Sequence, residues 1–260
     1  MKPNKLRELI KAGKPTLGVH SVIPWPRLIE LIGSTGAFDY IEYIGEYSTY
    51  DLELFENYGR AIELFPNMSM MIKVEEQSRG YIATRALDAG IQNALFADIR
   101  SADDVRECVR FIRPETPEAG GRHGAASRRI NVGSNAIEWV KQMNDAVLAF
   151  MIEKKSAVED LENILNVRGV SMVQFGPNDY SVSLGKPGQG FTPDIEKVHK
   201  QMIKMALAKG IAPRVEINSP EEAKPYIEMG VHHFCMGWDT QNISGWCKAQ
   251  GPALRKQLPY

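Results

Sequence analysis

Two acidic residues stand where apolar runs end, and they are the residues best placed to do chemistry. Glu153 closes the run 146–153 (AVLAFMIE), and Asp179 follows the run 169–176 (GVSMVQFG). A carboxylate at the end of a buried strand is costly unless it meets a cation or several hydrogen-bond donors. Two carboxylates, waters and a chelating substrate suit a hard divalent ion such as Mg²⁺, Mn²⁺ or Co²⁺. The structural alternatives are a salt bridge to Lys73 or a pair of helix caps.

Further polar side chains follow the other apolar runs. They are His20, Glu42, Glu46, Tyr47, Lys73, Glu75, Asp98, Arg100, Asn178, Glu216, Asn218 and Asp239. In a barrel of parallel strands, the carboxyl ends of all the strands meet at one face, which is where such barrels carry their active sites. We therefore expect this set to surround one site.

The apolar runs number eight, and longer segments with helical patterns separate them. Near-continuous apolar runs are typical of parallel strands that are buried on both faces. We place the strands near residues 15–20, 38–45, 68–74, 93–98, 146–153, 169–176, 211–217 and 232–237. Alternation of this kind, in a chain of 260 residues, predicts one (β/α)₈ TIM barrel that occupies residues 1–260 as a single domain.

Helix start and stop signals support this alternation. Ser101 is a good helix cap, and Pro193 and Pro220 occupy positions where helices begin, although Pro225 interrupts the third helix. An open, doubly wound sheet is the alternative fold. It would call for a glycine-rich dinucleotide loop after the first strand, but residues 18–26 read GVHSVIPWP.

Composition excludes several functional classes. The net charge is -1, with 31 Lys and Arg residues against 32 Asp and Glu residues, which argues against nucleic acid or an anionic membrane as the main partner. No apolar run approaches the roughly 18 residues of a membrane span. The N-terminus has no signal-peptide core, and three widely spaced cysteines form no disulfide framework. We expect a cytoplasmic protein with reduced thiols.

The motifs of the chain resemble those of a known enzyme family. GVSMVQFGPNDYSVSLG (169–185) is similar to the GVDGVFIGPADLSxxxG signature of the class II pyruvate aldolases, the 4-hydroxy-2-oxoheptanedioate aldolase (HpcH/HpaI) family of the phosphoenolpyruvate/pyruvate barrel superfamily. The likeness continues in IGEYS, LDAGIQNALFADIRSADD, MIEKKSAVEDLENIL and MGWDTQ. It covers most of the chain and implies a TIM barrel.

The resemblance also implies roles for particular residues. It implies that Glu153 and Asp179 ligate the metal, and that the backbone around Gly176, Asn178 and Asp179 receives a pyruvate-like carboxylate at a helix start. Asp88 matches an aspartate that orients the catalytic histidine, often from a neighbouring subunit. Glu46 matches a glutamate that supports the site or holds a water.

Four residues depart from the family pattern. Tyr47 replaces the histidine that moves the proton, and Ile44 replaces the aspartate of the same motif. Lys73 stands where the family has an arginine, and Met151 replaces a glutamine. The metal ligands are thus kept, while the groups that transfer the proton differ.

The residues at and near these changed positions can have more than one role. Lys73 can act as an electrostatic partner of the bound keto acid or, alternatively, as a Schiff-base lysine. Tyr47 can donate a proton or simply pack, and its ordinary pKa of about 10 makes it a poor base at neutral pH. His20 can supply the missing imidazole or serve as a core residue. His123, in the long irregular stretch 113–137, can belong to a mobile cover or a subunit contact.

Three functions remain open from the sequence. The first is a metal-dependent carbon–carbon lyase that cleaves or forms 4-hydroxy-2-keto acids from a pyruvate-like keto acid and an aldehyde. The second is another enolate reaction, such as decarboxylation, tautomerisation or hydrolysis, and the third is a non-catalytic barrel that binds a keto acid. The resemblance further implies a homohexamer whose subunits exchange the last helix, for which residues 239–257 are available, with Trp246 and Leu254 as anchors.

Overall fold

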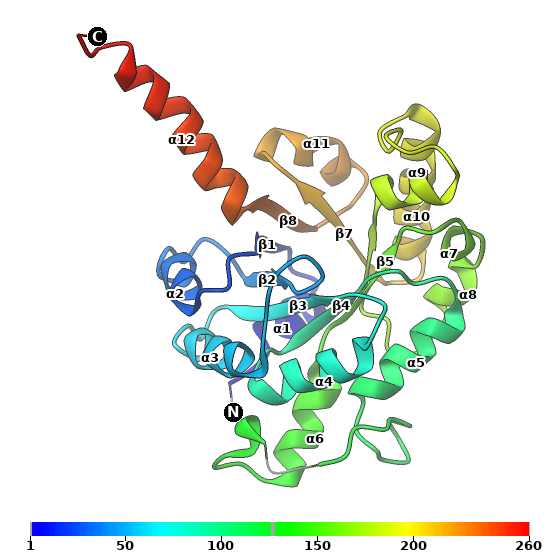
Figure 1. The fold of residues 1–260 in the computed structure, drawn as a ribbon. Helices are drawn as coiled ribbons and strands as arrows, with labels where there is room; N and C mark the ends of the chain where they lie inside the picture. The colour runs from blue at the N-terminus through cyan, green and yellow to red at the C-terminus, as the bar shows by residue number, and fades with distance from the viewer. Residues whose placement is uncertain (1, 126–127, 260) are drawn as a thin grey trace.

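The fold is a closed barrel of eight parallel strands, each paired with the next and the last paired with the first (Figure 1). It is described here from a computed structural model that covers residues 2–125 and 128–259. The strands are β1 Thr16–Ser21, β2 Tyr40–Ile44, β3 Ser69–Val74, β4 Asn93–Phe96, β5 Leu148–Ile152, β6 Met172–Phe175, β7 Ala212–Ile217 and β8 His233–Trp238. The barrel predicted from the sequence is therefore confirmed, and the open sheet is excluded.

Twelve helices are described, most of which wrap the outside of the barrel. They are α1 Lys5–Lys11, α2 Pro26–Ser34, α3 Leu52–Glu63, α4 Arg79–Ala89, α5 Ala102–Ile112, α6 Ala136–Asp145, α7 Lys155–Glu159, α8 Leu161–Leu165, α9 Pro177–Ser183, α10 Pro193–Ala208, α11 Pro220–Glu228 and α12 Asp239–Arg255, with a 3₁₀ turn η1 at Arg129–Asn131. Ser101 caps α5 by accepting from the Asp104 N–H at 3.3 Å, as the sequence predicts. Pro225 lies inside α11 without ending that helix.

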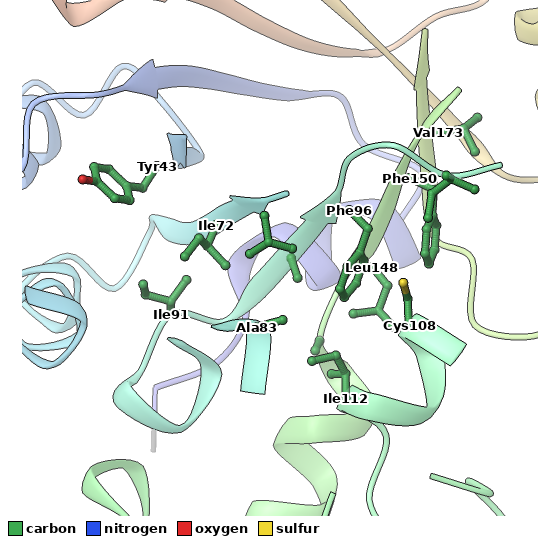
Figure 2. Close-up of a cluster of buried hydrophobic side chains, with 14 of the residues drawn as sticks. Tyr43, Ile72, Ala83, Ile91, Phe96, Cys108, Ile112, Leu148, Phe150 and Val173 are labelled. Atoms are coloured by element: carbon green, nitrogen blue, oxygen red, sulfur yellow. The ribbon is translucent and has the colours of Figure 1, made fainter. Parts of the chain in front are cut away.

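Two apolar clusters hold the barrel together, because neighbouring residues of one strand point to opposite sides. Along β2, Ile41 and Tyr43 face the larger cluster between strands and helices, part of which Figure 2 shows, whereas Tyr40 belongs to the smaller cluster inside the barrel. The ring of Tyr40 fills the barrel opposite Gly18, where an added Cβ would lie 2.2 Å from that ring. Glycine at position 18 therefore makes room for a large side chain at the barrel centre.

The amino-terminal end of the barrel is closed by α1, a helix that our sequence reading did not predict. Leu6 of α1 is fully buried in the inner cluster, and its N–H donates to the Ser69 hydroxyl at the start of β3. Asn4 caps α1 and also donates to Asn93 at 2.7 Å. With this end plugged, the opening of the barrel lies at the carboxyl ends of the strands.

The last helix, α12, leaves the body of the molecule instead of packing along it (Figure 1). Of its residues only Asp239 is buried, while Ile243, Trp246 and Leu254 are exposed. The Asp239 carboxylate anchors the start of the helix by accepting from the N–H groups of Val22 and Ile23 at 2.9 and 3.0 Å. Among the residues that the structure describes, no helix combines the length and hydropathy needed to cross a bilayer.

Candidate functional site

A cavity of about 770 Å³ opens at the carboxyl ends of the strands. Its size lies within the range of roughly 300–1,000 Å³ that ligand sites occupy. Most of the side chains singled out from the sequence line it, namely His20, Tyr47, Lys73, Glu153, Gly176, Asn178 and Asp179. Asp88 does not line the cavity, and neither do Glu46, Glu75, Asp98, Arg100, His123 and Asp239. The fold therefore brings together the residues expected to bind a metal and a keto acid, with His20 beside them.

One side of the cavity, which we call the Glu153 wall, is lined by Glu153, Gly176 and Asp179, and Asp98 and Lys154 contact these residues from outside the lining. Glu153 is only 3% exposed, and its Oε1 accepts the Asp98 N–H at 2.7 Å. Burial raises the pKa of its carboxyl to about 7, although Lys73 and the Asp98 amide act in the opposite direction. This carboxylate is thus removed from water without a salt bridge to a lysine or arginine of the described chain.

Gly176 allows the approach of Glu153. A Cβ at position 176 would lie 2.5 Å from Glu153 Oε2 and 2.6 Å from its Cβ, distances that atoms in real proteins do not adopt. The glycine is also the residue before α9, so the chain turns into that helix directly beside the carboxylate. Glycine is therefore needed here because the backbone of one strand end passes against the carboxyl of its neighbour.

Asp179 lies in the first turn of α9, and its carboxylate is half exposed. Lys154 Nζ lies 3.3 Å from Asp179 Oδ1 and 2.6 Å from Asp98 Oδ1, so the lysine is held mainly by Asp98. Asp98 adopts a left-handed backbone with φ of 55°, a conformation that aspartate tolerates better than most residues. Asp179 consequently keeps access to the cavity.

Lys73, at the end of β3, is bound by the two residues that follow β2. Its Nζ lies 2.5 Å from Glu46 Oε2 and 3.3 Å from the Tyr47 hydroxyl. Burial alone would lower the pKa of Lys73, but the charges of Glu46, Tyr47 and Glu153 outweigh burial and raise it above the ordinary value. Lys73 is therefore a fixed cation at neutral pH. Lys73 pairs with Glu46 and does not form the salt bridge to Glu153 that was the structural alternative.

Asp88 lies outside the cavity, at the carboxyl end of α4. It is 3% exposed, and its Oδ2 is 3.1 Å from His123 Nε2 and also contacts the Arg128 guanidinium. His123 is itself 4% exposed, with Nδ1 3.3 Å from the Ile112 carbonyl. Within one chain, Asp88 thus holds the irregular stretch 113–137 against α4. That Asp88 acts at the active site of a neighbouring subunit stays a prediction.

The other side of the cavity, which we call the His20 wall, is lined by His20, Glu42, Gln174, Glu216 and Trp238, with Arg214 behind them. Arg214, fully buried behind the cavity, forms an ion pair with Glu42, and its Nε lies 2.5 Å from Gln174 Oε1. Burial alone would raise the pKa of Glu42, but Arg214 and His20 hold it below the ordinary value. Glu42 is therefore an anion inside the barrel.

His20 is stacked on Trp238 and cannot easily turn. The ring centroids are 4.5 Å apart and the planes differ by 19°. The His20 side chain is 1% exposed, and burial lowers the pKa of its imidazole although Glu42 and Glu216 act to raise it. His20 is consequently a neutral imidazole near pH 7.

Sequence reasoning missed part of the site. Arg214 and Gln174 were not among the candidates, although a charge in the middle of the run 211–217 (IAPRVEI) signals a buried partner. His199 was not among the candidates either, yet it lines the cavity. It stacks on Phe175 with ring centroids 5.0 Å apart, and burial lowers its pKa to about 4.

Known proteins resemble this chain over most of its length. The sequence pattern of the HpcH/HpaI aldolase/citrate lyase family matches residues 59–244. The 4-hydroxy-2-oxo-heptane-1,7-dioate aldolase of Shigella boydii is 29% identical over 239 residues, which are 91% of this chain and 89% of that protein.

Solved structures give the same picture. The HpcH/HpaI aldolase of Desulfitobacterium hafniense superimposes with a TM-score of 0.85 at 25% identity, covering 98% of this chain and 97% of that one. The citrate lyase β subunit of M. tuberculosis, solved with oxaloacetate and magnesium, has a TM-score of 0.57 at 12% identity and covers 88% and 93% of the two chains. The second likeness shows the fold alone.

Proposed function

Because the chain belongs to the HpcH/HpaI aldolase/citrate lyase family, we propose that it is a metal-dependent carbon–carbon lyase. It would cleave and form 4-hydroxy-2-keto acids from a pyruvate-like keto acid and an aldehyde. The observation that carries this proposal is the Glu153 carboxyl, which is buried in the cavity without a salt bridge to a lysine or arginine of the described residues and lies next to Asp179 and Lys73.

The Glu153 wall fits a divalent cation. Burial disfavours the charged form of Glu153, and a bound cation would offset that cost. Gly176 leaves Glu153 Oε2 unobstructed, and carboxylate oxygens are the ligands that Mg²⁺ and Mn²⁺ prefer. We assign the metal to Glu153 and Asp179. When bound, such an ion would act as a Lewis acid on the keto and carboxylate oxygens of the substrate.

The residues around the ion would bind and orient the keto acid. We assign its carboxylate to the backbone at Gly176, Asn178 and Asp179, where α9 begins. Lys73 would place a fixed positive charge beside the enolate, since Glu46 and Tyr47 hold its ammonium in position. A lysine whose pKa is raised is protonated at neutral pH and is a poor nucleophile, so Lys73 supports enolate stabilisation over Schiff-base chemistry.

Cleavage requires one base. The base removes the proton of the C4 hydroxyl, the C3–C4 bond breaks, its electron pair enters the enolate, and the aldehyde leaves. The enolate then takes a proton at C3 and becomes the keto acid. We assign the proton transfers to Tyr47 or His20, which both line the cavity. Partial desolvation raises the pKa of Tyr47, so this phenol is protonated at neutral pH and has a proton to donate, whereas neutral His20 is able to accept a proton.

Proton exchange at C3 tests this function most directly. The purified protein is incubated with [3-²H]pyruvate with and without Mn²⁺, and loss of deuterium is followed by NMR. Metal-dependent exchange is expected for an enolate-forming enzyme, and exchange without any aldehyde reaction would favour decarboxylation, tautomerisation or hydrolysis instead. No exchange at all would leave the non-catalytic binding barrel as the better description.

The projecting helix α12 supports the proposed assembly. Its exposed Ile243, Trp246 and Leu254 are the kind of apolar side chains that a neighbouring subunit would cover. We therefore propose a homohexamer in which the subunits exchange α12. Light scattering at micromolar concentration should give six times the mass of one chain, and a monomer would exclude the exchange. We propose the cytoplasm as its location because Cys108, Cys235 and Cys247 are unpaired.

A further inference from the structure

Three hydrogen-bond acceptors converge on the His20 wall. His20 Nδ1 lies 3.1 Å from the Gly237 carbonyl oxygen, and a carbonyl can only accept, so Nδ1 carries the hydrogen. A neutral imidazole has one N–H, which leaves Nε2 as an acceptor. This Nε2 lies 3.8 Å from Glu42 Oε1 and 3.8 Å from Glu216 Oε2. Such a group of acceptors calls for a ligand that brings donors.

The acceptors are held rigidly. Glu216 Oε1 accepts from Trp238 Nε1 at 3.0 Å, and its Oε2 accepts from Gln174 Nε2 at 3.3 Å. Glu42 is fixed through its other oxygen by Arg214. Both Glu42 and His20 are 1% exposed, whereas the Glu216 side chain is 37% exposed and reaches the open part of the cavity. A ligand would therefore meet a preorganised surface, which lowers the entropic cost of binding.

The cavity is also strongly acidic. Among the described residues that line it, Lys73 is the only lysine or arginine, against the six acids Glu42, Glu153, Asp179, Glu196, Glu216 and Glu222. Lys73 is already held by Glu46 at 2.5 Å. A second carboxylate on the substrate, as in the 1,7-dioate for which the Shigella boydii relative is named, would find no accessible cation on the His20 wall, because Arg214 is fully buried behind the cavity and paired with Glu42.

A second metal ion explains these acceptors less well. Ligand atoms of His20, Glu42 and Cys235 lie within 4.8 Å of one another, which resembles a metal-binding group. Arg214 already neutralises Glu42, however, and a divalent cation there would lie against the guanidinium. An uncharged donor such as a hydroxyl group meets the three acceptors without that repulsion.

On the premise of the proposed lyase function, we propose that the His20 wall binds the aldehyde partner and selects uncharged, hydroxylated aldehydes over carboxylate-bearing ones. A hydroxyl of the aldehyde donates to Glu216 Oε2 or Glu42 Oε1. Because such hydrogen bonds are charge-assisted, each one favours the hydroxylated substrate by about tenfold to 100-fold. The His20 wall is thus the specificity-determining side of the cavity.

The test compares three aldehydes with the full-length, Mn²⁺-loaded enzyme and pyruvate. Glyceraldehyde is hydroxylated and uncharged, propanal lacks the hydroxyls, and succinic semialdehyde carries a carboxylate. The kcat/KM for glyceraldehyde should exceed each of the other two by at least about tenfold. Because the readout is a ratio between aldehydes, a general loss of active enzyme does not affect it.

Variants at position 216 sharpen the comparison. Glu216→Gln keeps the shape but removes the charge, and it should reduce the preference for glyceraldehyde over propanal by about tenfold. Glu216→Lys should shift the preference toward succinic semialdehyde. Glu221→Gln, the same change at an exposed position of α11 outside the cavity, should leave every ratio as in the parent.

The outcomes separate this inference from the function on which it rests. If [3-²H]pyruvate exchanges but succinic semialdehyde or propanal is the better substrate, the specificity inference alone is wrong. Unchanged ratios in both Glu216 variants would also overturn it. If pyruvate does not exchange with metal present, the proposed lyase function fails and the inference fails with it.

Discussion

The two walls of the cavity differ in how their carboxylates are paired. On the His20 wall, Glu42 is paired with buried Arg214, and Glu216 accepts from two side-chain N–H groups. On the Glu153 wall, Glu153 accepts one backbone N–H, and burial raises its pKa to about 7. Asp179 forms only a long ion pair with Lys154, with 3.3 Å between Oδ1 and Nζ.

This difference indicates which wall is suited to bind a cation. A carboxylate whose burial is already offset by a partner contributes shape and acceptor positions, and it gains little from a new cation. A buried carboxylate without such a partner gains most when a cation arrives. The Glu153 wall thus suits a metal ion, whereas the His20 wall suits neutral groups.

The largest effect is expected on metal affinity, from replacing a carboxylate of the Glu153 wall. Glu153→Gln keeps the side-chain shape but removes the anionic ligand, so Mn²⁺ affinity should fall by at least about 100-fold, because changes to mere supporting residues already cost 10–100-fold. Asp179→Asn should behave similarly. Binding is measured by titration followed by electron paramagnetic resonance. Glu159→Gln, at an exposed position of α7, is the matched control, and equal metal content in all four proteins would refute the ligand assignment.

Breaking the His20 wall should instead cost folding stability. Arg214→Met leaves Glu42 buried without its partner, which should lower the free energy of unfolding by about 3–5 kcal/mol. Replacing both residues by Met should restore most of that loss, since no uncompensated charge remains. Urea denaturation measures all three proteins. A double variant no more stable than Arg214→Met would show that the ion pair is not what stabilises this wall.

His199 links the cavity to pH-dependent stability. Its folded-state pKa of about 4 lies below the ordinary value of 6.5, so between these pH values the unfolded chain binds a proton that the folded chain does not. The contribution of His199 to stability should therefore fall as pH decreases from 6.5 to 4, by about 3 kcal/mol at most.

His199→Phe keeps the stacking on Phe175 and removes the titration, so the loss of stability in acid should become smaller. Thermal unfolding at pH 7 and pH 5 checks this, with His232→Gln, at an exposed position, as the control. An identical pH dependence in parent and His199→Phe would rule out His199 as the cause.

The last prediction concerns Tyr47, which lines the cavity beside Lys73. Tyr47→Phe removes only the hydroxyl that is 3.3 Å from Lys73 Nζ. General acid–base groups contribute roughly 10²–10⁴-fold, so turnover should fall by at least about tenfold while metal affinity is kept. If the parent rate is retained, Tyr47 only packs, and His20→Ala becomes the next test of the base.

Much of the fold was predictable because its signals are local. Each of the eight strands coincides with an apolar run, and the cap at Ser101 marks the start of α5. The sequence reading missed α1, although Asn4 caps it, because seven residues are too few to show a helical period. The direction of α12 away from the barrel has no local signal either.

The site was predictable only in part. Glu153 and Asp179 each end an apolar run, and that position alone brought them to attention. The pairing of Glu42 with Arg214 joins residues 172 positions apart, and neither residue carries a mark that identifies the other. Asp88 lies outside the cavity because it stands at the carboxyl end of α4, just before the start of β4, and sequence spacing does not reveal its contact with His123.

Gly176 limits how this sequence is able to evolve. Any substitution that replaces this glycine by another amino acid installs a Cβ, and that atom would lie 2.5 Å from Glu153 Oε2. No gradual route through slightly larger side chains exists at this position. Drift elsewhere in the motif 169–185 can proceed residue by residue, whereas a lineage that loses Gly176 must also give up Glu153 in its present place.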